Sequence, residues 1–172
     1  ATPDELWKHD TTNNSTFVVK DINPGVLSSS PSNLVVMGTR IYLAANDGSG
    51  GGIELQAYET TNNSTWQAAD IRPGFATSSP SDLAVLNTRV YMKATSGTHF
   101  ELWVYESTNN SFWEVSDIQS SSGSGGPSGL TVHDYTVYFT ANDGTTGQEL
   151  WAHNSINGTT WQVIDLNPTP ST

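Results

Sequence analysis

The stretch Glu101-Leu102-Trp103-Val104-Tyr105 decides the fold, because the chain repeats it at regular intervals. Copies of it begin at Glu5, Glu54, Glu101 and Glu149, which are 49, 47 and 48 residues apart. A period of this size is typical of propellers and solenoids. We therefore divide a single domain, residues 1–172, into repeats at about 5–53, 54–100 and 101–148 and a half repeat at 149–172.

Each repeat reads as two hairpins joined by a turn. The first, the type A hairpin, places two β-prone runs on either side of an Asn-rich loop, as between Glu5 and Ile22. The second, the type B hairpin, joins runs such as 34–36 and 41–44 through a tight turn at Gly38. Asn87 and Asp134 hold this turn position in the next two copies, and all three residue types tolerate left-handed backbone geometry.

Four antiparallel strands in each repeat of about 48 residues predict one blade of a β-propeller. The chain is then an all-β protein with about fourteen strands and about 3.5 blades, and no stretch shows a helical period. A solenoid of stacked hairpins is the alternative, because strand alternation is the same in both architectures.

The composition limits the classes of partner. Lys and Arg number 6 against 17 Asp and Glu, a formal net charge of −11, so the chain should repel nucleic acid and anionic membrane surfaces. No apolar run is long enough for membrane insertion. Cysteine is absent and only 13% of the residues are charged, a polar but uncharged composition that favours a secreted or cell-surface protein. The start at Ala1 looks like an end left by cleavage of a leader.

The run from Glu5 to Gly25, the run 33–55 and the run from Val137 to Trp151 resemble the ELWxxDGT repeat of bacterial and archaeal extracellular proteins, which is also found in hyalin-like surface proteins. A weaker similarity is to tachylectin-type lectins, which are small propellers. The resemblance implies a secreted or surface location and little chemistry. The Asp-Gly-Thr loop of the family is replaced here by Thr-Asn-Asn-Ser in three copies and by Ile-Asn-Gly-Thr in the fourth.

The Asn-rich loop of the type A hairpins is the most informative functional feature. Sequons for N-glycosylation occur there in all four copies, at Asn13, Asn14, Asn62, Asn63, Asn109 and Asn157. We expect a glycan on one Asn of each adjacent pair, because two neighbouring glycans would crowd each other. The alternative is that Asn, Ser and Thr occur there because they make good turns.

Residues that recur in every repeat are expected to serve the fold. A glutamate begins each type A hairpin, and an aspartate ends its second strand, at Asp21, Asp70, Asp117 and Asp165. Both carboxylates are expected to accept backbone N–H bonds from nearby turns. His9 and His153 hold the position of Tyr58 and Tyr105, so packing explains them better than catalysis. With no nucleophile elbow, phosphate loop or zinc motif, the sequence predicts that the chain is not an enzyme.

Asp47 and Asp143 lie in Asn-Asp-Gly loops that are weak candidates for Ca²⁺ binding. A hard cation prefers oxygen ligands but needs six to eight of them, so a turn is the simpler interpretation and no cofactor is expected. The regularly spaced tryptophans are expected in the core between blades, whereas exposed ones would stack on sugar rings.

The hairpins number four of type A and three of type B, so one terminal type A hairpin lacks a partner. That hairpin runs either from Glu5 to Ile22 or from Glu149 to Leu166, and its open edge is a template for strand addition by another chain. We therefore expect a homopolymer: a glycosylated extracellular structural protein that builds a filament or surface layer. The alternative function is a lectin-like, carbohydrate-binding or adhesin propeller.

Overall fold

A computed structural model describes residues 3–120, 123–166 and 168, which form fourteen β-strands and, within these ranges, no helix. The strands are β1 (Leu6–Asp10), β2 (Ser15–Lys20), β3 (Ser32–Met37), β4 (Arg40–Ala45), β5 (Glu54–Glu59), β6 (Ser64–Ala69), β7 (Ser81–Leu86), β8 (Arg89–Ala94), β9 (Glu101–Glu106), β10 (Ser111–Ser116), β11 (Ser128–His133), β12 (Thr136–Asn142), β13 (Gln148–Asn154) and β14 (Thr160–Ile164). The predicted all-β class is confirmed.

The strands form one two-stranded and three four-stranded antiparallel sheets. Strands β1 and β2 are the half-blade; β3–β6, β7–β10 and β11–β14 are blades I, II and III. Each full blade begins with a type B hairpin and ends with a type A hairpin, so about 3.5 blades are present, as predicted. The hairpin without a type B partner is therefore the N-terminal one, whereas β13 of the C-terminal type A hairpin pairs with β12.

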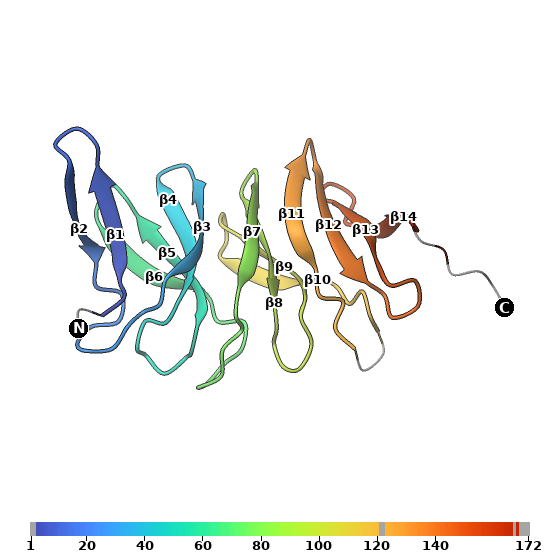
Figure 1. Ribbon diagram of the computed structural model, residues 1–172, viewed down its shortest axis with the longest axis horizontal. Coiled ribbons are helices and arrows are strands. Elements are labelled where there is room, and N and C mark those ends of the chain that lie inside the picture. The colour runs from blue at the N-terminus through green and yellow to red at the C-terminus, as the bar shows by residue number, and fades with distance from the viewer. Residues whose placement is uncertain (1–2, 121–122, 167, 169–172) are drawn as a thin grey trace.

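The sheets stand side by side in one row, and the half-blade and blade III lie at its opposite ends (Figure 1). The first strands of the three full blades, β3, β7 and β11, lie next to one another along one side of the row. Antiparallel four-stranded sheets that meet through their first strands are the arrangement of propeller blades around an axis. The structure therefore supports the propeller-like interpretation.

Tight turns join the strands of each type B hairpin, as the sequence predicted. Gly38, Asn87 and Asp134 have positive φ values of 61°, 56° and 51°. These values lie in the left-handed region, which Gly, Asn and Asp enter at lower cost than other residues.

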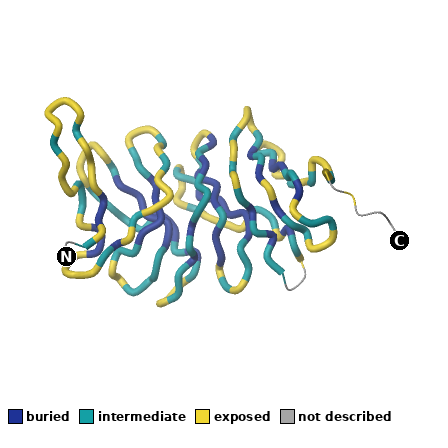
Figure 2. Tube along the Cα trace, viewed as in Figure 1, coloured by how far each residue is buried: buried dark blue, intermediate teal, exposed yellow. Residues whose placement is uncertain are grey.

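The core lies in the layers between successive blades, which we call seams, and Figure 2 shows the buried segments there. The I–II seam contains Tyr42 and Leu55 together with Tyr105, and the II–III seam contains Tyr91 and Leu102 with Phe139. The seam between the half-blade and blade I is smaller and contains Leu6, Ile22, Leu43, Ala45 and Tyr58. Each fully buried large apolar side chain contributes about 1.5–3 kcal/mol, so the seams hold the row together.

Candidate functional site

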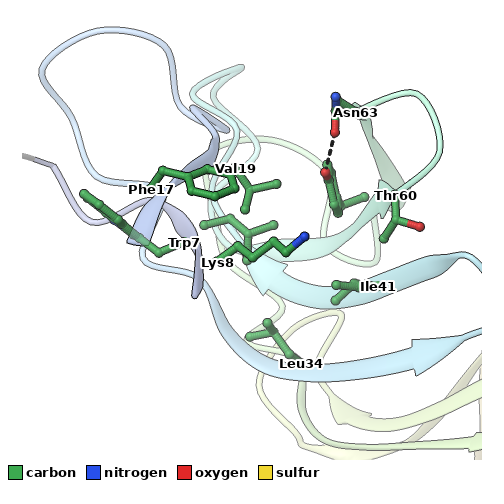
Figure 3. A pocket seen from close by; sticks show the side chains of 10 residues that line it. Trp7, Lys8, Phe17, Val19, Leu34, Ile41, Thr60 and Asn63 are labelled. Atoms are coloured by element: carbon green, nitrogen blue, oxygen red, sulfur yellow. Dashed lines mark hydrogen bonds between the residues drawn. The ribbon is translucent and has the colours of Figure 1, made fainter. Parts of the chain in front are cut away.

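A cavity of about 560 Å³ lies between the half-blade and blade I. Its walls are mostly apolar, and Figure 3 shows side chains reaching into it from both sheets. The half-blade contributes Leu6, Trp7, Lys8, Phe17 and Val19, and blade I contributes Leu34, Ile41, Tyr58, Thr60 and Asn63.

The cavity exists because the half-blade lacks two strands. In the full blades, β4, β8 and β12 pair with the edges of β5, β9 and β13. Within the described residues, β1 pairs only with β2, so its equivalent edge is open. At the other seams a tyrosine fills the corresponding space: Tyr42 packs on Tyr105, and Tyr91 packs on His153. Tyr58 on blade I corresponds to Tyr105 and His153, but no tyrosine of the half-blade packs on it, so it lines the cavity.

Three aromatic side chains and one cation give the cavity its chemistry. Trp7 and Phe17 are 47% and 44% exposed, so solvent reaches these rings, whereas Tyr58 is buried. The Tyr58 hydroxyl donates a 2.6 Å hydrogen bond to Asn63 Oδ1, which fixes the ring at the cavity wall. A concave apolar surface with a few polar groups is the usual form of a small-ligand site.

The first Asn of each type A loop makes the same turn in all four copies. The side-chain Oδ1 of Asn62 accepts hydrogen bonds from the N–H and the hydroxyl of Ser64, at 3.0 and 2.7 Å. Equivalent pairs of bonds join Asn13 to Ser15, Asn109 to Ser111 and Asn157 to Thr159. The hydroxyl two residues after each Asn therefore has a structural role in the turn, a role the sequence alone did not reveal. These four Asn side chains are exposed.

The second Asn of each loop has a different role. Asn14, Asn63 and Asn110 have φ values of 55°, 58° and 57°, and Gly158 takes this position in the fourth copy. Asn63 and Asn110 accept hydrogen bonds from the hydroxyls of Tyr58 and Tyr105. Sequence reasoning missed this Tyr–Asn bond, although its five-residue spacing recurs in two copies.

The recurrent glutamates have the role that the sequence predicted. Each is buried, at 6%, 0%, 3% and 3% exposure for Glu5, Glu54, Glu101 and Glu149. Each accepts a hydrogen bond from the backbone N–H seventeen residues later, at Ile22, Ile71, Ile118 and Leu166. The first three also accept from a residue twenty-four positions on, at Ser29, Ser78 and Gly125. The carboxylate thus fastens the type A hairpin to the loop that leaves it.

One of the recurrent aspartates, Asp70, does not fit the predicted role. The sequence predicts that Asp70 accepts N–H bonds from its turn, but its Oδ1 is buried with no hydrogen-bond partner in the described part of the chain. The N–H of Ile71, which follows it, is bonded to Glu54 instead. Glu54 accepts this N–H because its buried side chain reaches the turn from the paired strand β5.

The histidines are structural in their contacts. Nδ1 of His9 and of His153 lies within 2.8 and 2.9 Å of the hydroxyls of Thr16 and Thr160. His153 is buried against Tyr91, and burial, with a smaller contribution from the Arg89 charge, lowers its pKa to about 4. A neutral ring at physiological pH fits a packing role.

The weak Ca²⁺ candidates bond to their own loops. Asp143 accepts four hydrogen bonds from the backbone and hydroxyls of Thr145 and Thr146, and these bonds, led by the Thr146 N–H, hold its pKa well below the usual range. Asp47 accepts one from the Ser49 N–H. Within residues 3–120, 123–166 and 168, no group of three or more His, Cys, Asp or Glu side chains could hold a metal ion.

The tryptophans divide between core and surface. Trp103 is 9% exposed in the I–II seam, as the core prediction required. Trp7, Trp113 and Trp161 are 40–47% exposed. Trp113 is stacked under the Arg89 guanidinium, whereas Trp7 and Trp161 lie on the two end sheets of the row.

No helix of the described residues is long and apolar enough to cross a membrane.

Comparison with known proteins places the fold but no family. No protein-family profile matches this chain, and no curated protein sequence does. Among solved structures, the crystal structure of puromycin hydrolase superposes with a TM-score of 0.68 at 13% identity, over 92% of this chain and 23% of that one. A Mycobacterium tuberculosis puromycin-hydrolyzing peptidase gives 0.60 at 12% identity, over 86% and 23%. The chain therefore spans about a quarter of the length of these two proteins.

These similarities correct one prediction from the sequence. The sequence predicts that the chain is not an enzyme, but the two similar structures are a hydrolase and a peptidase. Blades of this kind thus occur within enzymes, and the absence of a familiar motif was a poor ground for the exclusion. At 12–13% identity the likeness shows the shared propeller-like fold alone.

Proposed function

We propose that this chain is a repeat module that assembles end to end with further copies of itself, as a glycosylated subunit of an extracellular filament or surface layer. The observation that carries this proposal is the exposure of apolar side chains at both ends of the row. Positions that are buried at the internal seams are open to water there.

The C-terminal end gives the clearest comparison. Ile22, Ile71 and Ile118 end the three earlier type A hairpins and are 5%, 3% and 8% exposed. Leu166 holds the same position in blade III and is 72% exposed, and no sheet of the described residues packs on it. Val163 and Ile164 next to it are 42% and 48% exposed. An apolar face of this kind is a typical site of protein association.

The N-terminal end is open in the same way. Trp7 is 47% exposed, whereas Gln56 and Trp103 at the same position in blades I and II are 1% and 9% exposed. The edge of β1 also presents backbone groups that a strand pairs with in every full blade. Open sheet edges and apolar faces are usually covered in native proteins.

The glycan part of the proposal rests on the four type A loops. Each exposes an Asn with a hydroxyl residue two positions later, and the loops lie at hairpin tips. Glycans there would leave both ends of the row free for contact. An extracellular location fits these sequons and the uncharged polar composition.

Sedimentation velocity on the purified chain over a hundredfold concentration range tests the assembly. We expect species larger than the 18.5 kDa chain that grow with concentration, and linear particles by negative-stain microscopy. A chain that stays monomeric at the highest concentration, with β1 and β14 protected from hydrogen exchange, would contradict the proposal.

A lectin-like or adhesin function is the second candidate, and the cavity favours it. Phe17 offers an exposed ring beside Lys8 at one concave site, which could hold a sugar ring. Binding to a glycan array that is lost in Phe17→Ala but kept in Trp113→Ala would support this function. Equal binding by both variants would exclude the cavity as the site.

A further inference from the structure

The two internal seams repeat one aromatic contact. The ring centroids of Tyr42 on β4 and Tyr105 on β9 are 5.5 Å apart, at an interplanar angle of 51°. Those of Tyr91 on β8 and His153 on β13 are 5.6 Å apart, at 50°. In each case the second strand of one blade contributes a tyrosine, and the third strand of the next blade contributes the ring that receives it.

Besides Tyr58, which lines the cavity, the strand register identifies two members of this series that have no partner among the described residues. Tyr138 on β12 pairs with Ala152 as Tyr42 pairs with Ala57, so Tyr138 is the third tyrosine of the series. It belongs to the last blade of the row, and no third-strand ring of the described residues packs on it. His9 on β1 pairs with Thr16 as His153 pairs with Thr160, so His9 is a receiving ring with no tyrosine before it.

We propose that blade III of one copy packs on the half-blade of the next, with Tyr138 against His9 of the second copy, so that this contact between copies repeats the Tyr91–His153 contact of the II–III seam. This inference rests on the proposed self-assembly and adds its partner surfaces and register. The tail surface is Tyr138, Leu150, Val163 and Leu166, and the head surface is Trp7, His9, Thr16 and Val18.

The residue types on both surfaces fit this register. Leu150 and Leu166 correspond to Leu102 and Ile118, which are buried in the II–III seam. Trp7 corresponds to Trp151, which packs against the same cluster. The half-blade already uses one face, through Leu6 and Val19, to contact blade I. The other face of the half-blade is therefore free. It corresponds to the faces of blades II and III that contact the preceding blade.

The geometry makes the contact heterologous. A tail surface on blade III matches a head surface on the half-blade, and the two lie at opposite ends of the row (Figure 1). A contact between two different surfaces leaves one head and one tail free after each addition, so it yields a chain of copies or a ring, depending on the rotation.

Two end-blocking variants test this register. Trp7→Asp blocks the head, and Leu166→Asp blocks the tail; both side chains are exposed in one copy, so each variant is expected to fold. Each variant alone should be monomeric by sedimentation velocity. An equimolar mixture should form a dimer of twice the 18.5 kDa chain and nothing larger, because only one head and one tail remain competent.

Phe75→Asp is the matched control, since Phe75 is 94% exposed in a loop outside both surfaces and should assemble like the wild type. Tyr138→Ala should raise the concentration needed for assembly at least tenfold, whereas His9→Tyr, which copies the Tyr42–Tyr105 pair, should keep it. Dimers of either end-blocked variant alone, or a mixture that stays monomeric, would overturn the register while wild-type assembly still stood. A monomeric wild type would instead refute the proposed function itself.

Discussion

The hydroxyl of Ser78 donates a 2.6 Å hydrogen bond to Oε2 of Glu54 across twenty-four residues, and neither residue is exposed. The same carboxylate accepts the N–H of Ser78 at 2.7 Å and of Ile71 at 2.9 Å. Burial raises the pKa of Glu54, and the hydrogen bonds from Ser78 and Ile71 oppose that effect. A buried carboxylate is tolerated here because donors from two loops surround it.

Replacing this carboxylate should therefore be costly. We expect Glu54→Gln to lower the free energy of unfolding by about 2–4 kcal/mol, because an amide N–H would face a buried N–H donor. Glu149→Gln is the matched control, since Glu149 accepts a hydrogen bond from the N–H of Leu166, and Leu166 is exposed. Its cost should be about 1 kcal/mol. Urea denaturation of both variants measures the difference, and equal costs would contradict the argument.

The burial of His153 makes stability depend on pH. Its pKa is about 4 in the folded chain against 6.5 for the free side chain, so between these values the unfolded chain binds a proton that the folded chain does not. The contribution of His153 is therefore fully present above pH 6.5 and is lost as the pH falls toward 4. The total is about 3 kcal/mol, at 1.36 kcal/mol per pKa unit.

His153→Tyr isolates this effect, because tyrosine occupies the same position in blades I and II and does not titrate in this range. The stability of the wild type relative to the variant should fall between pH 6.5 and 4.5, as measured by urea denaturation. Comparing the two chains cancels the contribution of Glu54 and Glu101, whose pKa values are raised by burial. A constant difference across this range would show that His153 binds its proton equally well in the folded and unfolded chains, and would contradict the prediction.

The two Asn residues of each loop should differ as glycan acceptors. The Asn62 side chain is exposed, and its Nδ2 makes no hydrogen bond to the described residues, whereas Asn63 is held by Tyr58 in a left-handed backbone. We expect native material to carry glycans at Asn13, Asn62, Asn109 and Asn157 rather than at Asn14 and Asn63. Glycopeptide mass spectrometry decides this point. Asn62→Gln should remove one glycan and Asn63→Gly none; native chains with the mass of the bare polypeptide would refute the prediction.

Gly52 should not tolerate a side chain. Its φ is 73°, and a Cβ there would lie 2.6 Å from the carbonyl oxygen of Ala76, which is backbone and cannot rotate away. Gly52→Ala should therefore destabilise the chain by at least about 1–3 kcal/mol. Gly97→Ala is the control, because the φ of Gly97 lies outside the left-handed region and a methyl group there would meet no atom within 4 Å. Thermal unfolding of the two variants should separate them clearly.

The repeat period and the alternation of apolar residues were enough to predict the all-β class, the hairpins and about 3.5 blades. These features depend on local chain geometry: positive φ at Gly38, Asn87 and Asp134, and two β-prone runs around each loop. The role of the repeated glutamates as acceptors of backbone N–H bonds also followed from recurrence, because a residue needed by every blade appears in every copy.

Only the tertiary structure decided where each blade begins and which hairpin is left over. Hairpins of both types repeat with the same period, so the sequence can be divided equally well before a type A or a type B hairpin. In the structure, β4 pairs with β5, so each type B hairpin forms a blade with the type A hairpin that follows it. The exposure of Trp7 and Leu166 was likewise invisible in the sequence, because both occupy positions that are buried in other copies. Burial depends on whether a neighbouring sheet is present, and that is a property of place in the row rather than of residue type.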